Sequence, residues 1–348
     1  MRYWVIPILC MLLFSCNFSS ENEFTSVEIE PIFVDSLSIR AIAPVSINQV
    51  WFAADKGTVG FIDNGIPKLA NVRYEDSILQ FRSIAALENN VFVMSVGNPG
   101  VLYKIDFNGS EATNMHEVYV EKGEKVFYDA IRFWNENEGI AMGDPTEDCL
   151  SIIITRNGGD TWQKLPCSKL PKTETGEAAF AASNSNIAIV GDKVWIATGG
   201  KRARVFFSPD KGNSWEVFNT PIVQGEQMTG IYSIDFFDEN TGIIFGGNWD
   251  KKDFNEGNKA LTTDGGKTWK LLSNGAGPGY RSSVKFVPGS MGKGILAVGT
   301  PGISYSPDQG NSWTELSAEG FFALEFINDT IAFASGTNKI SKLLFKKK

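Results

Sequence analysis

Five charged side chains recur at one kind of position, just before a small residue that opens a short apolar stretch. They are three arginines and two carboxylates: Arg40, Arg82, Asp129, Glu177 and Arg281. The planar arginine fork donates paired hydrogen bonds to a carboxylate, and a positioned carboxylic acid can transfer a proton. If the fold brings these positions together, we expect a site for an anionic ligand such as a carboxylated sugar.

Three interpretations of these residues stay open. In the first, they bind a ligand or a partner without chemistry. In the second, Asp129, Glu177 and Tyr280 are the catalytic groups of a glycoside hydrolase, and the arginines hold its substrate. In the third, the arginines and carboxylates pair with one another and line a polar, water-filled channel.

The elements that must position these side chains form a repeat. A small residue followed by a large apolar one occurs seven times, at intervals of about 47 residues. A second apolar run and a glycine-containing turn follow each pair, a pattern typical of short antiparallel strands. Equivalent positions of the repeats should converge on one axis. The seven pairs are Ala41-Ile42, Ser83-Ile84, Ala130-Ile131, Ala179-Phe180, Ser233-Ile234, Ser283-Val284 and Ala323-Leu324.

A second pattern, Ser/Thr-x-Asp/Asn-x-Gly-x-Ser/Thr-Trp, returns four times and resembles the Asp-box of sialidase-type repeats. The Asp or Asn accepts N–H groups of a tight turn, the Gly permits a positive φ, and the Trp packs between sheets. Incomplete versions of the pattern, which keep the Asp and a Gly but lack the Trp, occur at Asp63 and Asp106. The pattern predicts turns with a structural role, whose marker residues are Asn157, Trp162, Asp210, Trp215, Asp264, Trp269, Asp308 and Trp313.

Together the repeats predict an all-β fold, a seven-bladed β-propeller of four-stranded antiparallel blades. The last unit ends one strand short. Residues 27–34 alternate as a strand should and belong to no unit. We therefore expect this N-terminal strand to close the last blade and remove an exposed edge.

The N-terminus predicts export. Residues 1–15 combine one positive charge with an apolar run, which is typical of a signal peptide, and Leu13-Phe14-Ser15-Cys16 resembles a bacterial lipobox. Lipid on Cys16 would anchor the protein to the cell envelope, on the periplasmic or outer-membrane side. The alternative is ordinary cleavage near Ser19. With cleavage before Cys16, residues 16–25 form a flexible tether, and residues 26–348 form the propeller.

Composition limits the kinds of partner and cofactor that the protein can bind. The net charge of −8 disfavours nucleic acid, and a single histidine, His116, excludes multi-histidine metal sites, so we expect no metal and no cofactor. Cys149 and Cys167 fall almost opposite each other across a predicted hairpin, which leaves a disulfide or two free buried thiols open. The polar insertion 248–258 is expected to be a hydrated loop that exposes Trp249 for binding.

The whole exported chain resembles the photosystem II stability/assembly factor family, in a secreted branch of Bacteroidota type that is often labelled oxidoreductase. Carriers of the resemblance are Tyr128-Asp129-Ala130-Ile131-Arg132-Phe133-Trp134, Gly143-Asp144-Pro145, residues 176–183 and residues 220–225. It implies a non-enzymatic scaffold that holds a protein or glycan partner, and we expect the protein to be a monomer. The sequence has no dinucleotide fingerprint, haem motif or ferredoxin cysteines to support an oxidoreductase. The sialidase-like hydrolase remains the alternative.

Overall fold

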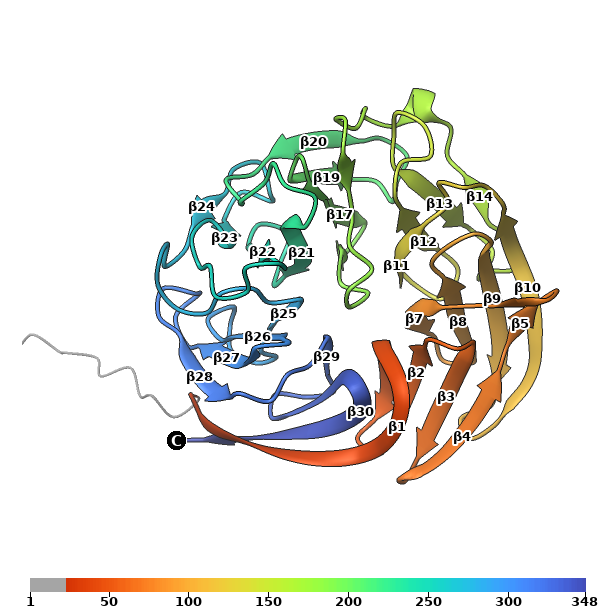
Figure 1. Cartoon of the computed structure of the whole chain (residues 1–348), viewed down its shortest axis with the longest axis horizontal. Helices are drawn as coiled ribbons and strands as arrows, with labels where there is room; N and C mark the ends of the chain where they lie inside the picture. Colours follow the sequence, from red (N-terminus) through yellow and green to blue (C-terminus); the bar gives the residue numbers. More distant parts are fainter. Residues whose placement is uncertain (1–22) are drawn as a thin grey trace, which may run out of the picture.

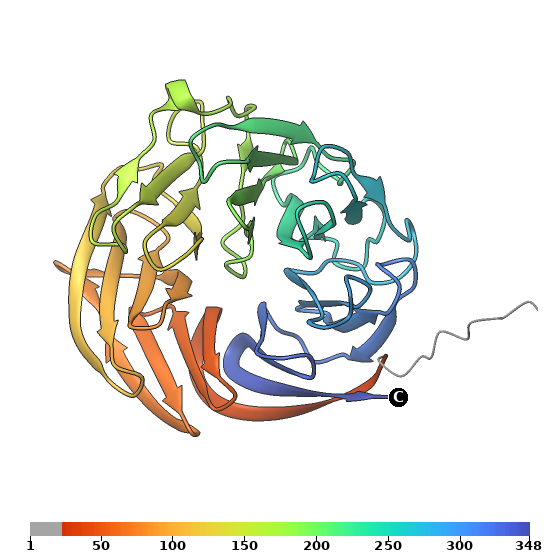
Figure 2. The ribbon, with the colours of Figure 1, turned by 180° about the vertical axis from the view of Figure 1, so that it is seen from behind.

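The computed structural model describes residues 23–348, which form a ring of antiparallel sheets around a central axis (Figures 1 and 2). Each sheet packs between two others, so its strands are buried on both faces, as in the fully buried strand Ser151–Thr155. The only helical element among the described residues is one 3₁₀ turn at Cys167–Lys169. No helix in this part of the chain has the length and apolar character needed to cross a bilayer.

Four sheets have four strands each, and the chain runs through each sheet from the axis outward (Figure 1). They are β7 (Phe81–Ala86), β8 (Asn90–Ser95), β9 (Gly100–Phe107) and β10 (Ala112–Glu121); β11 (Tyr128–Phe133), β12 (Gly139–Gly143), β13 (Ser151–Thr155) and β14 (Gln163–Lys164); β16 (Ile187–Val190), β17 (Lys193–Ala197), β19 (Arg204–Ser208) and β20 (Glu216–Asn219); and β25 (Ser283–Phe286), β26 (Ile295–Gly299), β27 (Gly302–Ser306) and β28 (Thr314–Ser317).

Two further sheets have six strands. In one, β21–β24 repeat the four-stranded pattern and two short strands extend it; in the other, β29 and β30 continue into β1–β4. A two-stranded hairpin, β5 (Arg73–Tyr74) and β6 (Ser77–Ile78), lies beside them. The six-stranded sheets contain β15 (Glu177–Ala178), β18 (Gly199–Gly200), β21 (Thr229–Phe236), β22 (Gly242–Asn248), β23 (Lys259–Thr262) and β24 (Lys270–Leu271), and β29 (Ala323–Phe326), β30 (Ile331–Lys347), β1 (Phe24–Ser46), β2 (Gln49–Ala54), β3 (Thr58–Asp63) and β4 (Ile66–Asn71).

The prediction of seven separate blades is wrong, because the ring closes through two long strands rather than through a seventh sheet. β1 pairs with β30 along Phe24–Ser38 and with β2 along Ile39–Ser46, so one strand joins the first and last units into a single sheet. Six large sheets result. The expected pairing of residues 27–34 with the C-terminal strand is present, with Val27 opposite Phe345 and Val34 opposite Lys339.

The N-terminal segment is described only from Glu23 onward. Phe24 and Thr25 were expected to lie in the tether, but they belong to β1, where Phe24 stacks on Phe345 with ring centroids 4.5 Å apart. The predicted signal peptide, Cys16 and the rest of the tether lie outside the described residues. In the described part, Cys149 and Cys167 form a disulfide with their Cα atoms 5.5 Å apart.

Six of the seven small–large pairs lie on axis-side strands, but the pair Ala179-Phe180 does not. The inner strand of its sheet begins at Ile187, and residues 179–186 form an irregular stretch, the axial segment, which reaches the centre of the ring (Figure 1). Asn184 in this segment bridges two sheets, since its Nδ2 donates to Ile84 O at 2.7 Å and its Oδ1 accepts from Ile131 N at 3.0 Å. The axial segment therefore occupies part of the central region, which one of the three interpretations had described as a water-filled channel.

The four repeated turns hold themselves by one set of hydrogen bonds. Ser306 Oγ donates to Asp308 Oδ1 at 2.9 Å, Asp308 Oδ1 accepts from Ser312 N at 2.8 Å, and Trp313 Nε1 donates to Gly310 O at 3.0 Å. Gly310 has φ +85°, a conformation that disfavours other residues. The turns at Thr155, Ser208 and Thr262 use equivalent bonds. Their carboxyl and amide groups are thus engaged in holding backbone.

Candidate functional site

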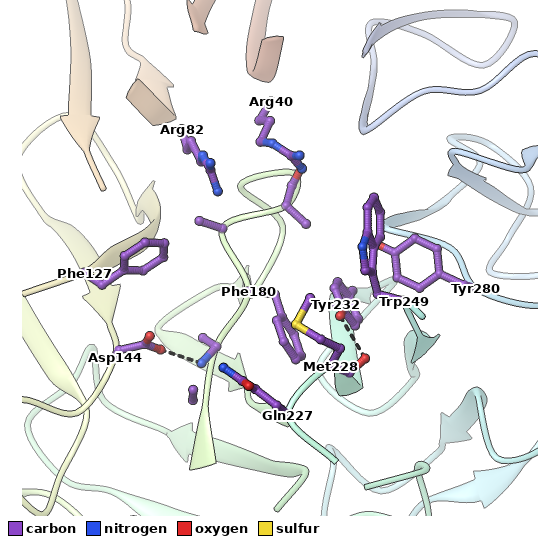
Figure 3. A pocket seen from close by; sticks show the side chains of 14 residues that line it. Arg40, Arg82, Phe127, Asp144, Phe180, Gln227, Met228, Tyr232, Trp249 and Tyr280 are labelled. Atoms are coloured by element: carbon purple, nitrogen blue, oxygen red, sulfur yellow. Dashed lines mark hydrogen bonds between the residues drawn. The ribbon is translucent and has the colours of Figure 1, made fainter. Parts of the chain in front are cut away.

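A pocket of about 380 Å³ lies at the axis and is called the axial pocket here (Figure 3). The ends of inner strands and the axial segment supply its walls. Arg40 of β1 and Arg82 of β7 form one side, and Asp144 with Phe127 forms another. An aromatic wall faces the arginines, and it consists of Phe180, Tyr232, Trp249 and Tyr280 with Met228 beside them.

Neither arginine forms an ion pair within the described residues, although the Asp55 charge acts on both. Arg40 Nη1 donates to Ala182 O at 3.4 Å, and its guanidinium lies over the Phe322 ring, 4.1 Å from the centroid. Arg82 makes no hydrogen bond or ion pair with any residue of the described chain. Burial lowers the pKa of both, and the Arg82 charge also acts on Arg40, whose pKa falls to about 10. Both remain cationic at neutral pH, so the pocket favours an anion.

The aromatic wall is built by rings that support one another. Phe180 stacks on Tyr232 with centroids 3.9 Å apart and planes within 2° of parallel. Tyr280 meets Tyr232 edge-on at 4.7 Å and Trp249 edge-on at 5.3 Å. Such a wall offers a fixed apolar face for an aromatic ring, an aliphatic side chain or a sugar face.

Two buried carboxyl groups lie on the opposite side. Asp144 accepts a hydrogen bond from Ala179 N at 2.7 Å, and burial raises its pKa to about 6. Asp129 is fully buried, and neither carboxyl oxygen has a hydrogen-bond partner in the described chain. Burial and then the Asp144 charge raise the Asp129 pKa, while Arg82 acts to lower it. Burial therefore favours the protonated form of Asp129, which weakens one of the negative charges that act on Arg82.

Glu177 does not reach the axial pocket, contrary to the prediction. Its carboxylate is buried and accepts from Arg204 Nε at 3.0 Å, from Arg204 Nη2 at 2.5 Å and from Thr198 Oγ1 at 2.6 Å. The reason is local, because Glu177 belongs to β15, which pairs with Gly199-Gly200 rather than starting an inner strand. Its partner Arg204 lies in the basic stretch that follows this glycine pair in the chain.

Arg281 also lies outside the pocket lining. Its Nη1 donates to Tyr280 O and its Nη2 to Ser304 Oγ, both at 2.8 Å, so its guanidinium is turned into the protein. The three predicted catalytic groups are not assembled either. Tyr280 lines the pocket, Asp129 is fully buried and is not part of the lining, and Glu177 pairs with Arg204. Burial moreover raises the Tyr280 pKa, which opposes its use as a nucleophile.

Sequence reasoning missed part of the aromatic wall. Phe180 was placed on an inner strand, whereas the axial segment carries it into the pocket. Asp144 was noted only as part of a motif. Trp249 was expected to be exposed for binding on a hydrated loop, whereas it is half-buried in the pocket lining. The missed residues lie where the chain departs from its repeat, and that departure was the available signal.

Metal and histidine chemistry have little support within the described residues. No group of three or more His, Cys, Asp or Glu side chains with metal-binding geometry occurs there. His116 lies exposed on the outer strand β10 and pairs with Asp106 at 3.2 Å. The residues of the axial pocket therefore provide anion binding and an apolar contact, and one carboxyl group for proton exchange.

Comparison with known proteins gives a likeness at the level of fold. No family model matches the sequence, and no curated protein matches it either. Among solved structures, YCF48 bound to the D1 peptide superposes with a TM-score of 0.65 at 14% identity, over 94% of this chain and 98% of that one. YCF48 from Cyanidioschyzon merolae gives 0.61 at 15% identity, over 92% and 98% of the two chains.

An enzyme is equally similar. A catalytically inactive virginiamycin B lyase from Staphylococcus aureus with quinupristin gives a TM-score of 0.66 at 11% identity, over 91% of this chain and 99% of that one. At such identities the likeness establishes only the architecture, which hosts both binding proteins and enzymes. This chain is an all-β propeller that shares its fold with YCF48 and with streptogramin-type lyases.

Proposed function

We propose that this chain is a non-enzymatic binding scaffold whose axial pocket holds a segment of a partner protein. Arg40 and Arg82 bind a carboxylate of that segment, and the aromatic wall receives an adjacent apolar side chain. The observation that carries the proposal is Arg82, which lines the pocket without a hydrogen bond or ion pair in the described chain. A half-buried cation without a hydrogen-bond partner can gain charge-assisted hydrogen bonds from a bound carboxylate.

The structural neighbours support a protein partner. YCF48 has been solved bound to the D1 peptide, and it covers nearly the same length as this chain. A peptide also matches the pocket chemically, because one residue supplies both a carboxylate and a side chain of the size that the aromatic wall accepts. A glycan partner would use the same wall through its sugar face.

The sialidase-like hydrolase has less support. A sialidase-like reaction departs from the common two-carboxylate scheme: it needs a tyrosine nucleophile with a carboxylate beside it, and a second carboxyl group as acid and base. Of the carboxylates considered, Asp144 lines the pocket, Asp129 is enclosed, and Glu177 is held by Arg204. Binding therefore accounts for more of the geometry than hydrolysis does.

The setting of this function follows from the sequence. We propose that the repeated turns are Asp-boxes, and that the monomeric protein is exported and anchored through lipid on Cys16. Replacing Cys16 with Ser should release the protein from membranes into the soluble envelope fraction. Continued membrane association of this variant would contradict the lipid anchor.

Peptides with one free carboxylate test the binding site. We expect labelled pentapeptides that end in a free carboxylate after a phenylalanine to bind in fluorescence anisotropy, and their C-terminal amides to bind at least tenfold more weakly. Arg82→Gln should remove that difference. Arg73→Gln, on the hairpin β5–β6 outside the pocket, is the matched control. Equal binding of acids and amides by the wild-type protein would refute the arginine role.

A fluorogenic sialoside tests the alternative on the same protein. Turnover that is lost in Asp144→Asn but retained in Arg73→Gln would replace the scaffold with an enzyme. Binding of a sialylated glycan without turnover would keep the pocket and change the partner class.

A further inference from the structure

A second cavity, of about 540 Å³, lies away from the axis between two neighbouring sheets, and it is called the outer cavity here. Its floor comes from β2, β3 and β9 and includes Trp51, Phe61 and Ile105. Its rims are β4 on one side and the start of β10 on the other, with Leu69, Ala112 and Met115 among the lining residues. Figure 1 shows β4 and β10 on the outside of the ring.

Other units of the ring fill the equivalent place with an indole. In each intact repeated turn, a tryptophan stands three residues after the turn glycine and donates its Nε1–H to that glycine's carbonyl, as Trp162 does to Gly159 at 3.2 Å. This tryptophan packs against the preceding sheet, where Trp162 meets Phe92 edge-on. Three residues after Gly109, in the incomplete turn between β9 and β10, stands Ala112. The missing indole leaves the outer cavity open.

The same change leaves a hydrogen-bond donor without a partner. Trp195 on β17 donates its Nε1–H to Gly265 O, in the turn of the next sheet, at 2.8 Å. Trp51 holds the matching place on β2 and is only 4% exposed, yet its Nε1–H has no acceptor in the described chain. Gly109 O in the facing turn accepts from Gln49 Nε2 at 3.1 Å instead. A buried donor of this kind favours a ligand that brings an acceptor.

The rim offers a place for an extended chain. β4 hydrogen-bonds only to β3, so its outer edge has free backbone groups, and all six of its residues are exposed. Ile66 and Leu69 on this strand are 64% and 47% exposed, which is a large apolar surface for an edge strand. Such an edge can add a strand from another protein, whose side chains then enter neighbouring pockets.

We propose that the outer cavity is a second binding site, which receives a tyrosine side chain from an extended partner segment paired with β4. The ring takes the place that an indole fills in the intact units, and the phenol oxygen accepts the Trp51 Nε1–H. Tyrosine meets both demands of the cavity, because it carries an aromatic ring and an acceptor at its tip. The site is independent of the axial pocket and of the function proposed for it.

Three capped pentapeptides test this proposal, with alternating threonine and valine around a central tyrosine, phenylalanine or alanine. By calorimetry we expect the tyrosine peptide to bind wild-type protein about tenfold more tightly than the phenylalanine peptide, the value of roughly one buried hydrogen bond. The alanine peptide should show no saturable binding. In Trp51→Phe, the tyrosine and phenylalanine peptides should bind equally, because the donor is gone and the ring remains.

A second variant fills the cavity from within. Ala112→Trp restores the indole of the intact units and should abolish binding of the tyrosine peptide. Val34→Trp, at a strongly exposed position of β1, controls for the added tryptophan. If Ala112→Trp does not fold, the Trp51→Phe comparison still decides. The proposal is overturned if the wild-type protein does not bind the tyrosine peptide, if the alanine peptide binds as well, or if Trp51→Phe preserves the tenfold preference.

Discussion

The axial pocket and the outer cavity arise from departures from the same repeat, but the departures differ in kind. At the axis, residues 179–186 leave the strand pattern and carry Phe180 among inner-strand ends that bear Arg40 and Arg82. At the rim, the strands remain regular and a turn has lost its tryptophan at Ala112. An irregular backbone thus produced a charged site, and a lost side chain produced an apolar one.

The protein also treats its buried or half-buried polar side chains in two ways: some have no hydrogen-bond partner, and others are fully paired. The protein leaves Arg82 and the Trp51 indole without partners, whereas it fully pairs the Glu177 carboxylate with Arg204 and Thr198. Unpaired groups that line a cavity can gain a partner when a ligand binds, while paired groups contribute to stability only. Stability and binding should therefore respond to different substitutions.

The largest expected effect is on stability, at the paired carboxylate. Glu177→Ala leaves the Arg204 guanidinium buried without its partner, so we expect the free energy of unfolding to fall by about 3–5 kcal/mol. Urea denaturation measures this loss. Peptide binding at the axial pocket should persist in the fraction that stays folded. A loss of affinity at unchanged stability would place Glu177 in the site after all.

Arg82 should behave in the opposite way. Arg82→Gln removes an unpaired, partly buried charge, so stability should stay within about 0.5 kcal/mol of wild type. Affinity for a peptide carboxylate should fall by at least tenfold. Melting temperature and anisotropy on one preparation give both values. A strong destabilisation without a change in affinity would show that Arg82 supports the fold and not a ligand.

Features of the fold that depend on local chemistry could be predicted from the sequence, whereas features that depend on packing between distant segments could not. The turn frames predicted the all-β ring, because each of their residues has one local task that needs no knowledge of the partner sheet. The small–large pairs failed at Ala179-Phe180, since the same two residues suit an inner strand and the axial segment equally well. Only contacts such as those of Asn184 with Ile84 and Ile131 choose between these structures.

The site residues show the same limit. Arg40 and Arg82 were placed correctly at the axis by counting repeats, but Glu177 and Arg281 were not, because a side chain's direction depends on its neighbours. The number of sheets could not be read from the number of repeats either. Whether two half-sheets merge depends on the continuous hydrogen bonding of β1 with both β30 and β2.

Trp195 and Trp51, which hold matching places on β17 and β2, allow a test with a smaller expected effect on stability. Trp195→Phe leaves the Gly265 carbonyl without its donor and opens a gap beside Phe236, so we expect a loss of about 1–3 kcal/mol. Trp51→Phe breaks no hydrogen bond and borders an existing cavity, so its cost should be clearly smaller. Urea denaturation of both variants measures the difference. Equal losses would mean that the Trp51 indole N–H has an acceptor in solution.

The smallest effect concerns pH and the carboxyl side of the axial pocket. The Asp144 pKa of about 6 lies above its ordinary value because of burial, so the folded state binds a proton more tightly than the unfolded chain does. The stabilisation is complete below about pH 4 and is lost as the pH rises through about 6. Asp144→Asn should remove this part of the pH dependence, measured by urea denaturation at about pH 4, 5 and 7.

Asp235 provides the matched control, because burial raises its pKa to about 6 and it lies outside the pocket lining. Asp235→Asn should reduce the pH dependence of stability over the same range without changing peptide affinity. The affinity for a carboxylate ligand should fall as the pH rises through about 6, because a charge on Asp144 opposes the binding of an anion beside Arg82.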